Sequence, residues 1–171
     1  DGFAQDAVIA ASGAQSAAFW RLRESISEAE RAAGPAMQHD ISVPVDSMPD
    51  FIIHAAAEVE RRFPRVKASA FGHLGDGNVH FHVLAPPGVD GENWRNGEGL
   101  AASAFVYDLV VAANGSISAE HGIGQMKRKT LARTIDPARL SAMRAIKHGL
   151  DPKNIMNPGK LLPLASDTIE S

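Results

Sequence analysis

Cysteine is absent from the 171 residues of this chain, which excludes disulfides, thiolate metal ligands and a cysteine nucleophile. No apolar run approaches the roughly 20 residues of a membrane-spanning helix, and no signal peptide is visible. Positive charge is not in excess either, because 17 basic residues face 20 acidic ones and leave a net charge of -3. The sequence therefore gives no reason to expect nucleic acid or an anionic membrane surface as a partner.

The residues that are present are 44% hydrophobic and 22% charged, a composition typical of a globular domain with a buried core. The length predicts one domain over residues 1–171, with 150–171 as a C-terminal tail that has no clear periodicity. The chain opens on Asp1 and Gly2 rather than on methionine, and residues 6–10 have the pattern of a strand already under way. We therefore expect a fragment of a larger protein.

Hydrophobic periodicity in the middle of the chain predicts strand, helix, strand, strand, helix and strand. The predicted ranges are 40–45, 47–62, 67–74, 79–85, 100–113 and 116–118. Further helices are predicted over 14–33, 125–134 and 137–149, the first with a buried stripe of Phe19, Leu22, Ile26 and Ala29. The central order is the split βαβ order of a ferredoxin-like fold. We expect an α+β protein whose antiparallel sheet carries helices on one face.

The segment Phe71–His82 places three histidines around a Gly-Asp-Gly-Asn turn. If Leu74 faces Val79 across a tight hairpin, His73 faces His80 and His82 lies on the same face. Opposed residues have Cβ atoms roughly 4.5–5.5 Å apart, so two imidazoles can share one metal ion. The alternative to a metal site is that this polar face of the hairpin packs against another domain.

A second cluster lies in the segment Ser116–Arg128, where Glu120 offers a carboxylate and His121 a base near neutral pH. Gly122 and Gly124 allow close approach of the backbone to a bulky group. A site of His73, His80 and Glu120 has two imidazoles and a carboxylate and leaves positions open for substrate or water. This ligand set favours zinc, with manganese or iron also compatible.

Two weaker patterns complete the candidates. Arg23 and Ser27 lie four residues apart on one predicted helix face and can bind an anion together, although a solvated helix face explains them equally well. The Asn157–Lys160 segment has the composition of a simple turn.

Three segments, Phe71–His82, Ser116–Arg128 and Asn154–Pro163, together closely resemble the C-terminal domain of FAD-linked oxidases. This is the group of D-lactate, glycolate and D-2-hydroxyglutarate dehydrogenases in the vanillyl-alcohol oxidase superfamily. The resemblance covers nearly the whole chain and implies oxidation of a D-2-hydroxy acid to a 2-oxo acid by hydride transfer to FAD. It also implies that a separate N-terminal domain, absent from this chain, binds most of the FAD, while this domain caps the flavin and builds the substrate pocket.

The resemblance assigns roles to individual residues by motif. It implies that a divalent metal, expected to be zinc, is held by His73, His80 and Glu120. It makes His121 the base that takes the proton of the substrate 2-hydroxyl. The implied substrate-binding residues are Arg23, Ser27, Gln38 and His82, with Arg23 as the clamp on the carboxylate. The residues expected at the cofactor are Gly122, Asn157 and Lys160.

Three positions depart from the pattern of the relatives. Gln38 stands where relatives often carry a substrate-binding lysine, and Ser27 stands where some have threonine. His82 replaces an asparagine of the 2-hydroxyglutarate type and either extends the metal shell or hydrogen-bonds the substrate. Without the lysine, a related 2-hydroxy acid becomes a more plausible substrate than 2-hydroxyglutarate itself.

Two other function classes stay open. One is a free-standing metal-dependent hydrolase in which Glu120 or His121 activates a metal-bound water, and the other is a non-catalytic assembly module whose histidines stabilise an interface. For the oxidase, the expected partners are a small 2-hydroxy acid, the protein's own N-terminal FAD domain and an electron acceptor, with a homodimer left open. We expect a cytoplasmic protein, with peripheral attachment to a membrane also left open.

Overall fold

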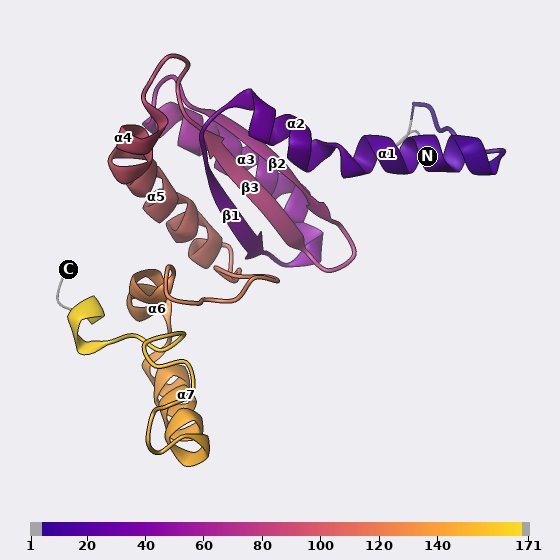
Figure 1. Ribbon diagram of the computed structural model, residues 1–171. Coiled ribbons are helices and arrows are strands. Elements are labelled where there is room, and N and C mark those ends of the chain that lie inside the picture. The colour runs from indigo at the N-terminus through magenta and orange to yellow at the C-terminus, as the bar shows by residue number, and fades with distance from the viewer. Residues whose placement is uncertain (1–4, 169–171) are drawn as a thin grey trace. The chain divides into compact units, whose positions relative to one another are not determined.

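The computed structural model describes residues 5–168 and divides the chain into two compact units, Asp1–Pro35 and Ala36–Ser171. The N-terminal unit contains the helices α1, Gly13–Glu24, and α2, Ile26–Ala33 (Figure 1). The prediction of one helix over 14–33 is wrong at Ser25, which lies between them. The Ser25 hydroxyl donates to the carbonyl of Leu22 at 2.8 Å, a local bond that competes with the regular helix.

Two further predictions for the N-terminal unit are wrong. The side chains of the expected buried stripe are largely exposed, with Phe19 at 43% and Leu22 at 70%. Residues 6–10 form no strand, and Val8 and Ile9 are exposed without a strand partner among the described residues. Apolar periodicity can define one face of a helix, but two short helices have no second layer within their own unit on which to bury it.

The second unit is built on three antiparallel strands in the order β1-β3-β2 (Figure 1). The strands are β1, Ala36–Ser42; β2, Lys67–His73; and β3, Asn78–Leu84. Helix α3, Met48–Arg62, connects β1 to β2, while α4, Gly91–Asn96, and α5, Glu98–Ala112, follow β3. The predicted α+β class is confirmed, and β1 is an edge strand of the three.

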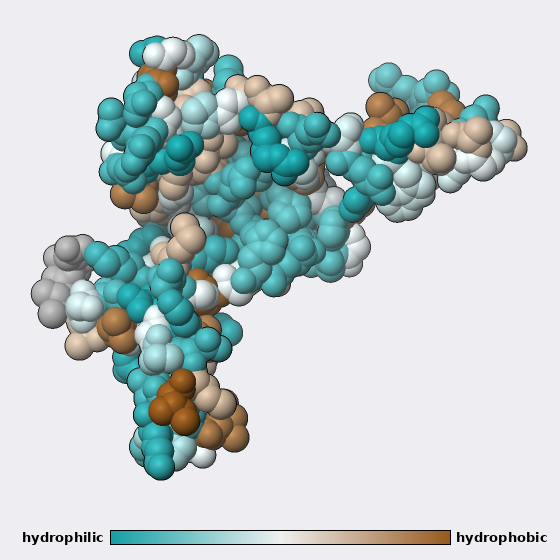
Figure 2. All heavy atoms as spheres, in the orientation of Figure 1, coloured by the Kyte–Doolittle hydropathy of each residue, from teal (hydrophilic) through white to brown (hydrophobic). Residues whose placement is uncertain are grey.

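Alternate residues of the strands point to opposite faces, and the described helices of the second unit cover one of them. Val79, Phe81 and Val83 of β3 are fully buried together with Ile41 of β1. The helical side of this core consists of Phe51, Ala55 and Val59 from α3 and Ala102, Val106 and Val110 from α5. Within the described part of the second unit no helix packs on the other face of the sheet, and Figure 2 shows mainly hydrophilic residues over it.

The predicted fourth strand, 116–118, is reduced to a single bridge between Ser42 and Ser116 beside β1. Gly115 allows this approach, since a Cβ there would lie 2.4 Å from the carbonyl oxygen of Ser42. The chain then continues as an irregular loop into α6, Arg128–Thr134, and α7, Pro137–Leu150, which Asp136 caps through the amides of Ala138 and Arg139. Two short 3₁₀ helices, Val45–Ser47 and Ala165–Thr168, complete the described elements. Over residues 5–168, no helix has the length and apolar character to cross a membrane.

Candidate functional site

The uncovered face of the sheet collects polar side chains from all three strands. Strand pairing arranges them in three rows, Gln38–His82–Ser69, Asp40–His80–Phe71 and Ser42–Asn78–His73. Because the side-chain period of a strand is two, the three hairpin histidines share this face, as the sequence predicts.

The predicted pairing within the hairpin is wrong by two residues. His73 pairs with Asn78 rather than with His80, which instead faces Phe71. The turn has four residues, 74–77, in which Gly77 adopts φ 73° and donates its amide to the carbonyl of His73 at 3.1 Å. A shift of two residues keeps every side chain on its face, so His73 and His80 become diagonal neighbours with ring centroids 6.1 Å apart.

The loop after Ser116 brings Glu120 and His121 over the same face. The Glu120 Oε1 atom lies 3.6 Å from His73 Nδ1. The His121 ring lies with its centroid 6.2 Å from that of His80. Four of the predicted site residues are therefore gathered from three separate stretches of the chain, and the side chains of Glu120 and His121 are 48% and 68% exposed.

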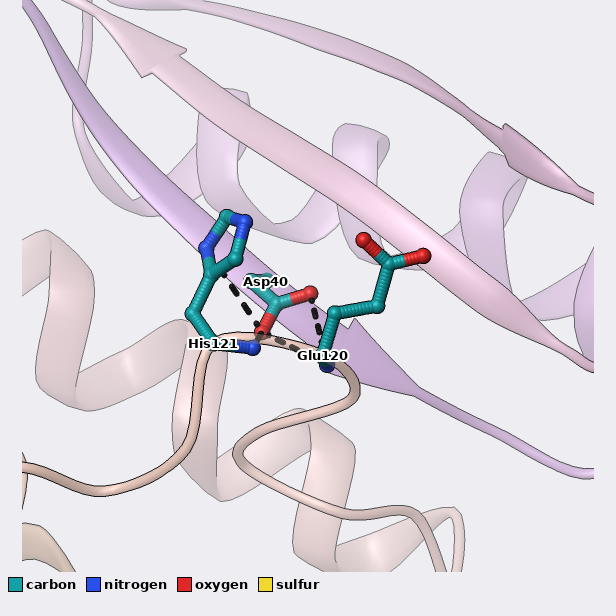
Figure 3. Close-up of side chains that lie close together, drawn as sticks. All are labelled: Asp40, Glu120 and His121. Atoms are coloured by element: carbon teal, nitrogen blue, oxygen red, sulfur yellow. Dashed lines mark hydrogen bonds and ion pairs between the residues drawn. The ribbon is translucent and has the colours of Figure 1, made fainter.

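These groups include the nitrogen and oxygen donors that divalent metals accept. Two ligands of one tetrahedral zinc ion, each about 2.1 Å from it, lie about 3.4 Å apart, close to the separation of His73 Nδ1 and Glu120 Oε1. Among the described residues, the grouping whose potential ligand atoms all lie within 4.8 Å of one another is Asp40 with Glu120 and His121, and not the predicted set of His73, His80 and Glu120 (Figure 3). Both carboxylates already accept hydrogen bonds, Asp40 from the backbone amides of Glu120 and His121 and Glu120 from the side-chain amide of Asn78.

Asp40 is a residue of this site that the sequence reasoning missed. Its carboxylate accepts the backbone amides of Glu120, at 3.0 Å, and of His121, at 2.8 Å (Figure 3). Burial acts to raise the pKa of Asp40, but these amide bonds, with the charges of His121 and Lys127, outweigh it and hold the pKa below its usual value. The available signal was strand alternation, which places a charged residue of β1 on the face of His80.

Asn78 and Lys127 also belong to this site and were not predicted from the sequence. Asn78 is buried and donates its side-chain amide to Glu120 Oε1 at 2.6 Å. Lys127 donates its Nζ to the carbonyl oxygens of Asp40, at 3.3 Å, and Ile117, at 2.9 Å. Burial lowers the pKa of Lys127, and the negative charge of Asp40 opposes that shift. Both residues lie inside the motifs of the sequence, but only contacts across the chain identify their partners.

The predicted substrate-binding residues fall into two groups. Gln38 and His82 are direct neighbours across β1 and β3, in the row beside that of His80. Arg23 and Ser27 belong to the N-terminal unit, so their role stays a prediction. In that unit the Arg23 guanidinium lies 5.5 Å from the ring centroid of Trp20 and lines a shallow cavity of about 280 Å³ with Ser16 and Phe19.

The predicted cofactor-binding residues come from two segments that the structure brings together. Leu161 donates its amide to the carbonyl of Gly124 at 2.7 Å, and Lys160 donates its side chain to Gln125. Gly122 adopts φ 75° and Asn157 φ 48°, backbone conformations that favour glycine and asparagine. A Cβ at Gly122 would meet nothing within 4 Å, so the turn itself and not local crowding explains this glycine.

Comparison with known proteins shows the family of the chain. Residues 1–161 match the family described as FAD linked oxidases, C-terminal domain. The chain belongs to this family. Among relatives of this FAD-linked oxidase domain, D-2-hydroxyglutarate dehydrogenase of Xanthomonas citri pv. viticola is 41% identical over 94% of the chain. The protein of the same name from Stutzerimonas stutzeri is 39% identical over 94%, and the mitochondrial one of Arabidopsis thaliana is 37% identical over 95%.

The alignments cover only a part of these relatives. They span 34% of the Xanthomonas and Stutzerimonas proteins and 27% of the Arabidopsis protein. The FAD-linked oxidase domain therefore spans about a third of the length of the curated relatives that it matches.

Proposed function

We propose that this domain builds the substrate site of an FAD-dependent dehydrogenase that oxidises a D-2-hydroxy acid to a 2-oxo acid. The gathering of His73, His80, Glu120 and His121 on one face of the sheet carries the proposal, since it combines a metal-ligand set with a base. The family of the chain supplies the reaction class, because its members are FAD-linked oxidases.

In this function His73, His80 and Glu120 hold a divalent metal, with zinc as the expected ion. His121 takes the proton of the substrate 2-hydroxyl on Nε2, because its Nδ1 faces Asp40 at 3.7 Å. When bound, FAD accepts the hydride from C2 and the metal polarises the 2-hydroxyl, which lowers the cost of developing negative charge on that oxygen. One proton and one hydride leave the substrate, and C2–O becomes a carbonyl.

The remaining predicted residues orient the substrate. Gln38 and His82 present an amide and an imidazole beside His80, where they can contact the distal end of a 2-hydroxy acid. Arg23 is proposed as the clamp on its carboxylate and Ser27 as a hydroxyl partner. Gly122, Asn157 and Lys160 are proposed to approach the flavin from the two segments that meet at Gly124.

The proposal includes an FAD-binding domain as the partner of this surface. Apolar side chains are exposed on α7 and on the loop that follows it, and brown spheres gather over α7 in Figure 2. They include Ile146 at 62%, Leu150 at 77% and Ile155 at 75% exposed. Several exposed apolar side chains close together are typical of a surface that another domain covers.

The substrate test compares 2-hydroxy acids on the full-length protein with FAD and an artificial electron acceptor, before and after chelation. The proposal expects turnover of a D-2-hydroxy acid that chelation abolishes and zinc, manganese or iron restores. Turnover that survives complete removal of metal contradicts the metal role, and activity in residues 1–171 alone contradicts the need for an FAD domain.

Gln38 is the position to vary for substrate choice. A lysine there adds a charge-assisted hydrogen bond to a distal carboxylate, so Gln38→Lys is expected to raise kcat/KM for D-2-hydroxyglutarate about tenfold. D-lactate, which has no second carboxylate, should change little. Gln38→Met is the matched control of similar length without charge. An equal effect of Gln38→Lys on both substrates would place Gln38 away from the distal group.

A further inference from the structure

The carboxylate of Asp40 accepts the backbone amides of Glu120 and His121, and its Oδ2 atom also lies 3.7 Å from His121 Nδ1 (Figure 3). The Asp40 side chain is 4% exposed, whereas those of Glu120 and His121 open to solvent. Asp40 is thus shielded from a ligand in solution. It is bonded instead to the two consecutive residues that carry the proposed metal ligand and base.

The loop that carries these residues has little other regular support. Residues 118–126 contain no helix or strand, and Gly122 and Gly124 both have positive φ with open space where a Cβ would be. Lys127 closes the loop by donating to the carbonyl oxygens of Asp40 and Ile117. Asp40 therefore attaches the loop to β1 at two points. Its carboxylate bonds the amides of Glu120 and His121, and its carbonyl oxygen accepts from Lys127 at the end of the loop.

The chemistry of a carboxylate suits this attachment. It has two oxygens and no hydrogen to donate, so it can accept several amides at once, and charged acceptors make the stronger hydrogen bonds. An asparagine of the same shape offers one acceptor and turns an N–H₂ group toward an amide N–H.

We propose that Asp40 is a positioning residue that holds Glu120 and His121 in place through their backbone amides before metal or substrate binds. What Glu120 and His121 then do rests on the proposed function, but the attachment itself does not. Its loss releases the loop without removing a metal ligand or the base.

The test uses the full-length protein with Asp40→Asn and a matched control, Asp151→Asn. Asp151 is also buried, accepts two backbone amides, of Ile155 at 3.0 Å and Met156 at 2.9 Å, and pairs with Lys147. Each substitution neutralises one buried carboxylate that accepts two consecutive backbone amides, in two different loops, although both amides bond Oδ2 of Asp40 and each oxygen of Asp151 accepts one. Amide hydrogen exchange, zinc affinity by chelator competition and the rate of flavin reduction by the active D-2-hydroxy acid are then compared.

Asp40→Asn is expected to speed exchange about tenfold at the amides of Glu120 and His121, the factor for one lost hydrogen bond. Zinc affinity and the rate constant of flavin reduction should each fall about 10–100-fold, as for other residues one step removed from a metal. The substrate dissociation constant should change less than about threefold, because no substrate contact is lost. In Asp151→Asn the faster exchange should be confined to residues 151–157, with zinc affinity unchanged.

Unchanged exchange at residues 118–124 in Asp40→Asn would overturn the proposal, as would an equal loss of zinc in Asp151→Asn. If the unsubstituted protein neither binds metal nor reduces its flavin, the proposed function is wrong. Amide hydrogen exchange in Asp40→Asn still tests whether Asp40 holds the loop. If Asp40→Asn does not fold, Asp40→Glu takes its place, since it keeps the charge but moves the carboxylate by one methylene from the amides of Glu120 and His121. Faster exchange at 118–124 then supports the attachment, and unchanged exchange overturns it.

Discussion

The two faces of the sheet use neighbouring residues of the same strands for opposite purposes. On β3, Val79 and Phe81 are fully buried against the helical core, while Asn78 and His80 alternate with them and face the candidate site. Packing against α3 and α5 holds the first set. The second set has no such layer and is held by strand pairing and by hydrogen bonds from a distant loop, which leaves the functional groups of the site accessible.

Histidine shows the difference most clearly. His39 on the core face is 1% exposed and is bonded at both nitrogens, to the carbonyl of Phe81 at 2.8 Å and to the Ser103 hydroxyl at 2.7 Å. A carbonyl can only accept, so Nδ1 carries the proton and Nε2 accepts from Ser103. Burial lowers the pKa of His39 to about 4, so it stays neutral near pH 7. His80, on the other face, packs beside the rings of His73 and His121 instead.

Removing the base of the polar face should give the largest effect. His121→Gln in the full-length protein is expected to lower the rate constant of flavin reduction about 10²–10⁴-fold, the usual contribution of a general base. Its stability should change by less than about 0.5 kcal/mol, because the side chain is 68% exposed. Stopped-flow absorbance of the flavin and chemical denaturation measure the two. A large loss of stability would mean that the two faces are not separable in this way.

The opposite pattern is expected from the core face. Phe81→Ala should destabilise the domain by about 3–5 kcal/mol, because it empties a fully buried position between the strands and the helices. Urea denaturation measures the loss. Phe81→Leu, which keeps most of the volume, is the control and should cost much less. A cost of Phe81→Ala under about 1 kcal/mol would contradict the assignment of this face as the core.

The next largest effect is expected on the pH dependence of stability, through the titration of His39. Its folded-state pKa of about 4 lies below the ordinary 6.5, so the unfolded chain takes up a proton at higher pH than the folded one. The stability due to neutral His39 is complete above pH 6.5 and is lost as the pH falls toward 4, by about 3 kcal/mol in total. Denaturation midpoints between pH 7 and 4 measure this loss. Glutamine has an amide donor and does not titrate in this range. In His39→Gln the part of the pH dependence of stability that comes from His39 should therefore vanish.

The smallest effect tests the partner of His39. Ser103→Ala removes the donor to Nε2 and leaves a buried acceptor unpaired, at an expected cost of about 1–3 kcal/mol at pH 7. Ser103→Cys, with a weaker donor of similar size, should cost less. The same denaturation series measures both variants. An unchanged flavin-reduction rate is expected because Ser103 lies on α5, on the helical side of the sheet.

Much of the fold and part of the site followed from local pattern. Alternation in 79–85 correctly placed His80 and His82 on one face and the core residues on the other, and the helix predicted over 137–149 matches α7. The hairpin pairing failed by two residues because the four-residue turn closed over 74–77, with Gly77 at positive φ, and not over the predicted 75–78. The buried stripe predicted for 14–33 failed because periodicity defines a face and does not supply the surface that covers it.

By itself the sequence determined which residues share a strand face, since the period of two is local, and it identified the chemical groups of the site in two motifs. Only the tertiary structure decided that Glu120 and His121 lie over His73 and His80, with Asp40 beneath their amides. Those contacts span about forty to eighty positions along the chain. They depend on how an irregular loop crosses the edge of the sheet, and no local periodicity encodes that path.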